Sequence, residues 1–252
     1  EARFLSLMFK TDMNGIDEPV YLRPETAGAI FVEFNNILDT MRPKLPFGIA
    51  QIGKAFRNEI VTGNFIFRVR EFEQMEIEYF FDPEQPWEPL FEKLLLEQEA
   101  FCLDLGLSPE SRRRYQHPQE KLSHYSRKTV DIEYNFPFGT KELFGLAHRG
   151  DFDLTKHAEF SGEKLEYFDQ QSARRFVPHV LEPTFGVDRA LLAVLHSAYH
   201  EEQLGEGEER VVLKLDKKVA PYKAAIFPLV RNKPEIVEKA RKIYTGLLAQ
   251  GV

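Results

Sequence analysis

The sequence has little cysteine, no long apolar run and no surplus of basic charge. Cys102 is the single cysteine among 252 residues, which excludes an intrachain disulfide and favours a reducing compartment. No apolar run reaches the roughly 20 residues that a membrane span needs, and no signal-peptide pattern stands at the start. We therefore expect a cytoplasmic protein that does not use a membrane.

The charge balance also limits the function. A net charge of −7 excludes a uniformly basic surface that binds nucleic acid without discrimination, although a local RNA contact is compatible with it. The sequence contains neither a GxxxxGK[ST] loop nor a strand-borne GxGxxG. A bound nucleotide would therefore have to be held mainly by side chains.

Hydrophobic periodicity predicts an α+β fold, in which helices flank a mostly antiparallel sheet. We expect helices at 24–41, 87–105, 188–199 and 234–249. Strands are expected at 48–59, 65–82, 129–134, 141–148, 177–182 and 222–229. The charged segment 108–126, including Arg112-Arg113-Arg114, is expected to be irregular and solvated.

An acidic, glycine-containing stretch, EEQLGEGEE at 201–209, is typical of a solvated linker. It predicts a catalytic core at 1–200, a linker at 201–218 and the beginning of a second unit at 219–252. The chain starts without Met, and we expect it to be a piece of a longer protein.

The chemistry-bearing residues gather on the two strands 48–59 and 65–82. Strand alternation places one set on a common face of the first strand: Gln51, Gly53, Ala55, Arg57 and Glu59. A second set shares a face of the partner: Arg68, Arg70, Phe72, Gln74 and Glu76. If these faces match, they form a polar floor. The alternative is a solvent-exposed hairpin with cross-strand salt bridges.

Two of these segments form motifs. FRNE at 56–59 followed by RVREF at 68–72 resembles motif 2 of class II aminoacyl-tRNA synthetases. EPTF at 182–185 followed by GVDR at 186–189 resembles motif 3. RPETA at 23–27 resembles a signature of the glycine-specific members. The stretches LPFGIAQIGKAFRNEI and REFEQMEIEYF are similar to glycyl-tRNA synthetases nearly letter by letter.

This resemblance implies a class II synthetase core that activates glycine with ATP and Mg²⁺ and transfers it to the 3′ end of a cognate tRNA. It also implies a homodimer formed through motif 1, which we expect to precede Glu1. The tail from Ala220 resembles the start of an α/β anticodon-binding domain. No zinc is assigned, because His196 and His200 are expected to be a surface pair with no third ligand nearby.

The resemblance assigns roles at the ATP site. Arg57 would hold the α-phosphate and the glycine carboxylate, and Phe72 and Arg189 would sandwich the adenine. Glu59 would accept from the adenine amino group, and Arg68 would meet the terminal phosphates. The catalytic set is Arg57, Arg189 and Glu142. Further ATP-binding candidates are Asn58, Phe67, Val69, Arg70, Glu71, Leu143, Gly186, Val187 and Asp188.

Two glutamates are candidate magnesium ligands. Glu142, in the sequence KELFG, matches the acid that holds Mg²⁺ against the phosphates in the family. One or two carboxylates suffice, because Mg²⁺ takes phosphate oxygens and waters as its other ligands. Glu182 is the second candidate. Without the motifs, each glutamate would be read as a surface or salt-bridged residue.

The glycine-binding candidates are mostly acids. Glu25, Glu76 and Glu73 match positions that clasp the substrate ammonium, although Glu73 is equally compatible with a solvated strand position. Thr184 would press on Cα and so exclude larger substrates by size. Arg149 is a candidate to meet the carboxylate, although the residues alone favour a structural ion pair for it. Their neighbours complete the set: Phe72, Gln74, Met75, Glu182, Pro183, Phe185 and Gly186.

Two other functions remain open on the residues. One is a class II synthetase for threonine, serine or proline, which RPE at 23–25 and Glu76 disfavour. The other is a non-catalytic, synthetase-like binding subunit. Such subunits lose the residues that grip ATP, whereas this sequence keeps them all: Arg57, Glu59, Phe72, Glu142 and Arg189.

Overall fold

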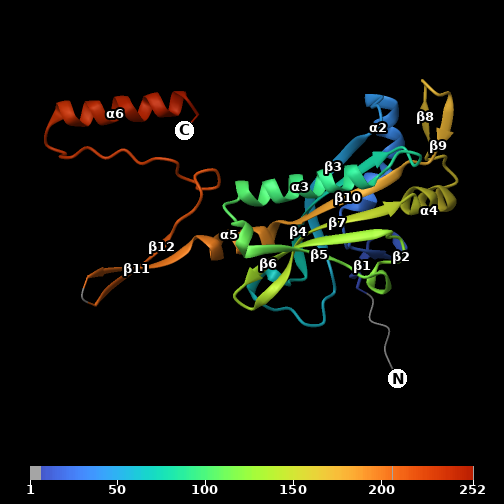
Figure 1. The fold of residues 1–252 in the computed structure, drawn as a ribbon, viewed down its shortest axis with the longest axis horizontal. Coiled ribbons are helices and arrows are strands. Elements are labelled where there is room, and N and C mark those ends of the chain that lie inside the picture. The colour runs from blue at the N-terminus through green and yellow to red at the C-terminus, as the bar shows by residue number, and fades with distance from the viewer. Residues whose placement is uncertain (1–6, 206, 252) are drawn as a thin grey trace.

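A six-stranded sheet is the centre of the fold in the computed structural model, which describes residues 7–205 and 207–251 (Figure 1). Its strand order is β3-β4-β10-β7-β6-β5, and every neighbouring pair is antiparallel. The strands are β3 (Phe47–Phe56), β4 (Glu71–Phe81), β5 (Arg112–Gln116), β6 (Lys128–Phe136), β7 (Gly139–Gly150) and β10 (His179–Gly186). The predicted α+β class is confirmed.

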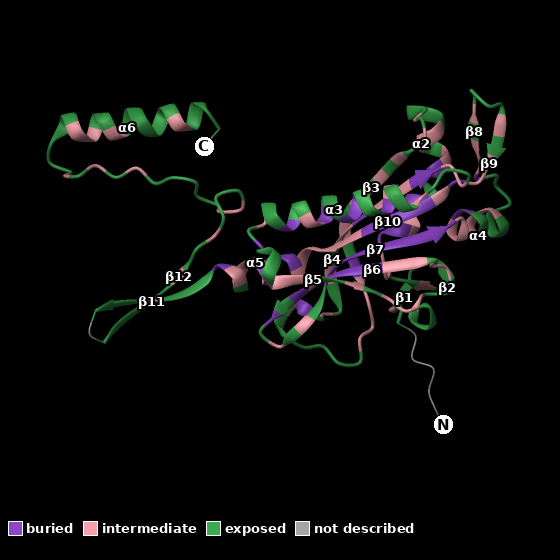
Figure 2. Cartoon of the chain, in the orientation of Figure 1, coloured by how far each residue is buried: buried purple, intermediate pink, exposed green. Residues whose placement is uncertain are grey.

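Helices cover both faces of this sheet. They are α1 (Ala27–Val32), α2 (Phe34–Met41), α3 (Glu88–Asp104), α4 (Phe152–Ser161) and α5 (Val187–Ala198). Residues of α3 and α5 pack into one apolar cluster, and residues of α1, α2 and α4 pack into another. Successive side chains of a strand point to opposite faces of the sheet, so Phe81 packs in the first cluster and Phe80 in the second. The buried residues accordingly follow the sheet (Figure 2).

The predicted helix at 24–41 is shorter and divided. It begins at Ala27, and Glu33 separates α1 from α2. The preceding residues are held against the sheet instead: Arg23 Nε donates to Lys54 O at 2.6 Å, and Thr26 N donates to Glu76 Oε2 at 2.9 Å. The Arg23 carbonyl also accepts from the backbone N–H of Phe56 at 2.9 Å, so the backbone before Ala27 is bonded to the sheet where the first helical turn was expected.

The segment expected to be irregular contains an edge strand. β5 pairs with β6, and the arginines are neutralised locally: Arg113 Nε lies 2.7 Å from Glu133 Oε2, and Arg114 pairs with Glu92 and Glu99. Cross-strand and neighbouring carboxylates thus stabilise a strand where the charge run predicted a solvated segment.

The C-terminal part differs most from expectation. The predicted linker contains a hairpin of β11 (Tyr199–Gly205) and β12 (Glu208–Leu213). Glu202 of β11 forms ion pairs with Arg210 of β12 and with Lys214, which follows β12 directly. The strand expected at 222–229 does not form. No described strand lies beside this segment, so its backbone N–H and C=O groups have no hydrogen-bond partners in a neighbouring strand.

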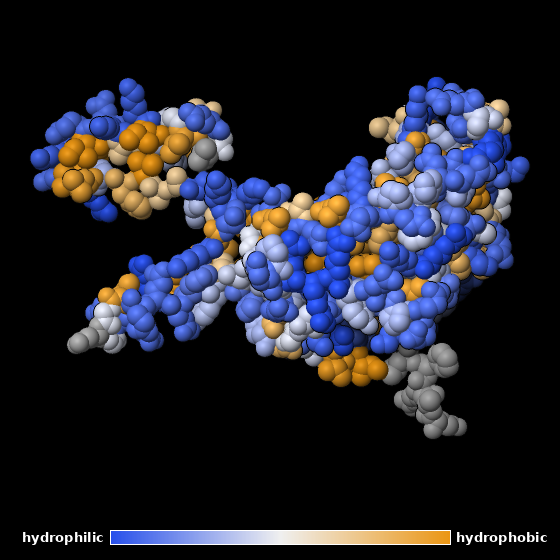
Figure 3. Space-filling model, in the orientation of Figure 1, coloured by the Kyte–Doolittle hydropathy of each residue, from blue (hydrophilic) through white to orange (hydrophobic). Residues whose placement is uncertain are grey.

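Helix α6 (Pro234–Ala249) matches the predicted helix at 234–249. It lies apart from the sheet in Figure 1, and none of its residues is buried. Apolar side chains gather along it in Figure 3, including the exposed Ile243, Tyr244 and Leu248.

Shorter elements complete the fold. A hairpin of β1 (Lys10–Met13) and β2 (Ile16–Tyr21) precedes α1, and a hairpin of β8 (Tyr167–Asp169) and β9 (Arg174–Phe176) follows α4. Among the described helices, none has the length and apolar composition required to cross a membrane.

Candidate active site

A cavity of about 250 Å³ opens on the face of the sheet that α1 and α4 partly cover. The cavity is lined by residues of β4, β6, β7 and β10, the loops around them, including the one that follows β3, and the start of α5. These are Glu25, Arg57, Glu59, Ile66, Phe67, Arg68, Val69, Phe72, Glu73, Gln74, Glu76, Ser123, Tyr125, Thr129, Asp131, Glu142, Leu143, Phe144, Gly145, Leu146, Ala147, Glu182, Thr184, Phe185, Gly186, Asp188 and Arg189.

The polar faces of β3 and β4 match over the residues that form the strands, whereas Arg57, Glu59, Arg68 and Arg70 lie in the connection between them. Gln51 pairs with Glu76, and Ala55 pairs with Phe72, so both sets point to the same side. Glu76 is only 2% exposed, which is incompatible with the alternative of a solvent-exposed hairpin. Thr184 of β10 pairs with Glu76 on the other side, so the motif 3 strand directly borders the motif 2 strand.

Arginines and aromatic rings gather at one end of the cavity, here called the mouth. Arg57 Nε donates to Pro24 O at 3.0 Å, and its guanidinium lies 5.3 Å from the centre of the Phe72 ring. Arg189 stands in the first turn of α5 and lies 4.4 Å from the Phe67 ring. The Arg189 guanidinium also donates to Glu142 Oε2 at 2.9 Å.

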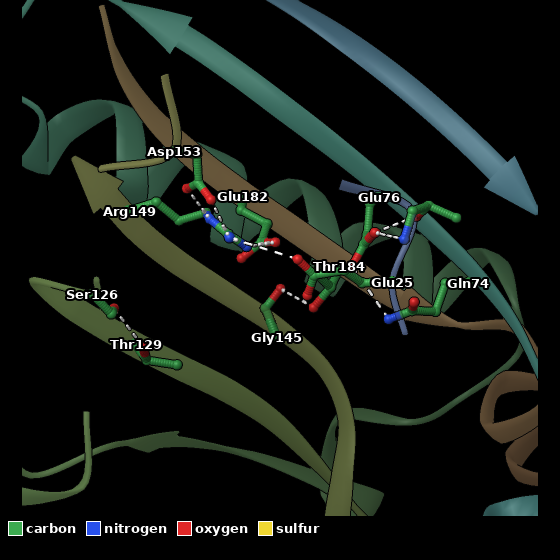
Figure 4. A network of polar contacts seen from close by, with 11 residues as sticks. Glu25, Gln74, Glu76, Ser126, Thr129, Gly145, Arg149, Asp153, Glu182 and Thr184 are labelled. Carbon is green, nitrogen blue, oxygen red and sulfur yellow. Dashed lines mark hydrogen bonds and ion pairs between the residues drawn. The ribbon is translucent and has the colours of Figure 1, made fainter. Parts of the chain in front are cut away.

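Carboxylates gather at the other end of the cavity, here called the inner end (Figure 4). Glu76 Oε2 accepts from the backbone N–H of Thr26 at 2.9 Å and from the Thr26 hydroxyl. Glu76 Oε1 accepts from Gln74 Nε2 at 3.2 Å. Glu25 lines the same end, where burial raises its pKa although the nearby Arg149 opposes the shift.

Arg149 does not line the cavity. It forms a structural ion pair, which was one of the two roles considered for it from the sequence. It is 4% exposed, donates to both carboxyl oxygens of Asp153 at 2.7 and 2.8 Å, and donates to Glu182 Oε1 (Figure 4). Its Nη2 lies 3.8 Å from Glu25 Oε1. Arg149 therefore neutralises part of the acidic inner end.

The inner end holds more acids than this arginine balances. Burial raises the pKa of Glu182, despite Arg149, and neighbouring acids add to the shift. Burial and the charge of Glu182 also raise the pKa of Glu78, whose two oxygens have no hydrogen-bond partner among the described residues. A small cationic group would stabilise the charged forms of these acids, so the inner end favours such a group as the occupant.

The two candidate magnesium ligands do not converge. Glu142 is at the mouth, with its side chain 48% exposed, whereas Glu182 is buried at the inner end and pairs across strands with Ala147. Within the described part of the chain, no three His, Cys, Asp or Glu side chains are grouped to hold a metal ion. Glu142 alone is placed for an ion that phosphate oxygens would also ligate.

Several predicted site residues do not line the main cavity. They are Asn58, Arg70, Glu71, Met75, Arg149, Pro183 and Val187. Asn58 borders a separate shallow hollow together with Glu59 and Arg68. Glu71 pairs with Lys54 on the partner strand, and Arg70 Nε donates to Glu59 O at 3.1 Å.

The sequence interpretation missed one wall of the cavity, formed by Ser123, Tyr125, Thr129 and Asp131. Asp131 Oδ2 and His117 Nε2 form a hydrogen bond of 2.7 Å. Burial raises the pKa of Asp131 to about 6. Alternation along 128–136 would have placed Thr129 and Asp131 on one face. Ser123 and Tyr125 lie where no periodicity is present.

Comparison with known families agrees with this site. The model of the tRNA synthetase class II core domain (G, H, P, S and T) matches residues 9–198. The chain therefore belongs to the class II aminoacyl-tRNA synthetase core family.

Within that family, the chain is similar to proteins named glycine–tRNA ligase. It is 51% identical to the one from Mycoplasmopsis synoviae, over 100% of this chain and 56% of the relative. It is 48% identical to the one from Thermus thermophilus, over 99% of this chain and 53% of the relative. The chain thus spans about half the length of these curated relatives.

Proposed function

We propose that this chain carries the glycine-activating core of a glycine–tRNA ligase. The observation that carries the proposal is the division of one cavity into an arginine-rich mouth and a carboxylate-rich inner end. The mouth suits the phosphates of ATP, and the inner end suits the ammonium group of an amino acid. The two reactants would meet between the two ends.

ATP is proposed to bind at the mouth. The adenine would stack between Phe72 and the Arg189 guanidinium, with Glu59 accepting from its amino group. Arg68 would meet the terminal phosphates, and Arg57 the α-phosphate. Because the Arg189 guanidinium pairs with the Glu142 carboxylate, we expect this ion pair to rearrange when ATP binds.

Magnesium fits the mouth through Glu142. The Glu142 carboxylate lines the cavity, is partly exposed and lies on the arginine-rich side, so it offers one hard oxygen ligand beside the proposed phosphates. A bound Mg²⁺ would neutralise charge on the phosphate oxygens. Glu182 is assigned instead to the inner end, because Arg149 already engages its carboxylate.

Glycine is proposed to bind at the inner end. Its ammonium would lie between Glu76 and Glu25, and its Cα would face Thr184. Glu182 and Arg149 would support this end by fixing its charge and geometry. The pocket would select the smallest amino acid by excluding side chains.

The reaction then needs positioning and charge stabilisation rather than a general base. The glycine carboxylate is already ionised at neutral pH, and one of its oxygens attacks the α-phosphorus while the bond to pyrophosphate breaks. Charge grows on the phosphoryl oxygens, where the planar fork of Arg57 would stabilise it. The product is glycyl-adenylate.

The remaining parts of the proposal concern the complete protein. It would transfer glycine to the 3′ end of its cognate tRNA in the cytoplasm, as a homodimer. We propose residues 1–200 as the catalytic core, 201–218 as a connection that includes the β11–β12 hairpin, and 219–252 as the start of an anticodon-binding domain. The apolar side of α6 supports this assignment, because it suits packing against further chain.

ATP–pyrophosphate exchange across the twenty amino acids tests the proposal directly. Glycine should support exchange far better than threonine, serine or proline. Exchange with one of those amino acids would retain the class II assignment and refute the glycine assignment. No exchange with any amino acid, in the complete protein, would favour a non-catalytic binding subunit.

A further inference from the structure

The inner end of the cavity has a wall made by one cross-strand pair, Gly145 of β7 and Thr184 of β10. Thr184 Oγ1 donates to Gly145 O at 3.3 Å. Gln98 Nε2, from α3, donates to the same carbonyl at 2.8 Å and approaches Thr184 O at 3.5 Å. Both strands of the wall are therefore tied to a helix on the opposite face of the sheet.

Packing alone does not account for Gln98. It is 2% exposed and lies in the apolar stripe of α3, with Leu94, Leu95 and Cys102 as buried neighbours. A buried amide destabilises a core unless it is hydrogen-bonded, and Gln98 Oε1 has no partner among the described residues. An apolar side chain would fill this position without an unpaired oxygen, so the hydrogen bond to Gly145 is the distinguishing feature.

Gly145 is required for space rather than for backbone freedom. It is not among the described glycines with positive φ, so its strand conformation is open to any residue. A Cβ at this position would lie 2.9 Å from Thr184 Oγ1 and 3.6 Å from Asp131 Oδ1. A side chain would therefore displace the Thr184 hydroxyl or enter the cavity.

We propose that Gly145, Gln98 and Thr184 act together to determine substrate size. Gln98 is a positioning residue that fixes the Gly145 carbonyl from behind the sheet. The missing side chain of Gly145 leaves the Thr184 hydroxyl free to form the wall beside the substrate Cα. This inference rests on the proposed activation of glycine and adds two specificity-determining residues to it.

The first test is Gly145→Ala in the complete protein, assayed by ATP–pyrophosphate exchange. The added methyl should raise the glycine KM about tenfold or more and leave the ATP KM unchanged. An unchanged ATP KM also shows that the variant is folded. A glycine KM at the parental value would overturn the role of Gly145.

A double variant tests the contact with Thr184. Thr184→Ala removes the oxygen that the Gly145→Ala methyl would meet, so the combined loss in glycine kcat/KM should be smaller than the product of the two single losses. Strictly multiplicative losses would show that the two residues act independently and would overturn the proposed unit.

Gln98→Met tests the positioning role without a change in the cavity lining. Loss of the hydrogen bond should lower the ratio of glycine to alanine kcat/KM about fivefold. Leu95→Met is the matched control, since it alters packing of the same helix and should leave the ratio at the parental value. Equal ratios in the two variants would overturn the role of Gln98.

The parent protein separates this inference from the proposed function. A parent that activates glycine while the Gly145 and Gln98 variants keep parental specificity would refute only the size-determining unit. A parent that activates a different amino acid would refute the glycine assignment and this inference together.

Discussion

The mouth and the inner end of the cavity use charge in opposite ways. At the mouth, Arg189 and Glu142 are partly exposed, at 25% and 48% for their side chains. At the inner end, Arg149, Glu182 and Glu76 are nearly or completely buried, and the acids outnumber the cation. Exposed charges are screened and rearrange easily, whereas buried charges depend on fixed partners.

This difference suits two unlike ligands. ATP is large and highly charged, so side chains that move and exchange partners at the mouth accommodate its entry. Glycine is small and offers one cationic group, so selection for it requires a rigid, desolvated set of acceptors. Substitutions at the two ends should therefore affect different kinetic parameters.

The largest effect is expected for Arg57→Ala at the mouth. Removing a donor that strengthens in the transition state should lower the rate of adenylate formation by about 10²–10³. Single-turnover measurement of adenylate formation checks this. Lys54→Ala is the control, because Lys54 is exposed, pairs with Glu71 and does not line the cavity. Near-normal exchange by Arg57→Ala would contradict the assignment.

The next effect is expected for Glu76→Gln at the inner end. The change keeps size and removes the charge that faces the ammonium, so the glycine KM should rise about 10- to 100-fold. The ATP KM should stay near the parental value. Steady-state exchange with each substrate varied in turn separates the two parameters. A rise in both KM values would show that the two ends are not independent.

A smaller effect is expected for Glu142→Gln. Loss of one carboxylate ligand should weaken magnesium binding at the mouth, so the variant should need about tenfold more Mg²⁺ for half-maximal exchange. Activity should recover at high Mg²⁺, and the glycine KM should remain parental. A Mg²⁺ titration of exchange rate measures this, and parental Mg²⁺ dependence would remove Glu142 from the metal site.

The smallest effect is expected for Glu78→Gln, and it concerns stability. Because burial raises the pKa of Glu78, the folded state holds a proton that the unfolded state releases as pH rises. Unfolding free energy should then fall with rising pH above the unfolded pKa. The variant has no carboxyl group to titrate at this position, so its Tm should gain on that of the parent as pH rises above the ordinary glutamate pKa of 4.5.

Glu78 does not line the cavity, so Glu78→Gln should change the glycine KM far less than Glu76→Gln, which lies on the same face of β4. A constant Tm difference across that pH range would show that Glu78 has no raised pKa.

Local patterns predicted the strands and motifs of the site well. Alternation correctly placed Gln51 and Ala55 on one face of β3, and Phe72 and Glu76 on one face of β4, because each strand carries these residues at every second position; the register that pairs Gln51 with Glu76 came from the structure. Likewise, the start of α5 after Gly186 follows from the switch to helical periodicity at Val187.

Long-range partners could not be predicted in the same way. Glu182 of β10 engages Arg149 of β7, and Gln98 of α3 donates to Gly145 of β7, yet nothing in their neighbouring residues indicates either contact. The β11–β12 hairpin was missed because its acidic strand is stabilised by basic residues of the next strand. Side-chain contacts of this kind depend on the tertiary arrangement of the elements, which local sequence patterns do not specify.

The position of β4 in the sheet has a consequence during synthesis. β4 pairs early with β3, but its other edge stays open until the much later β10 has been made. An open strand edge invites pairing with another chain, and inward-pointing charged residues discourage it. Glu76 and Glu78 stand on the open strand throughout this interval. We therefore expect these two acids to disfavour pairing of β4 with another chain before the site exists.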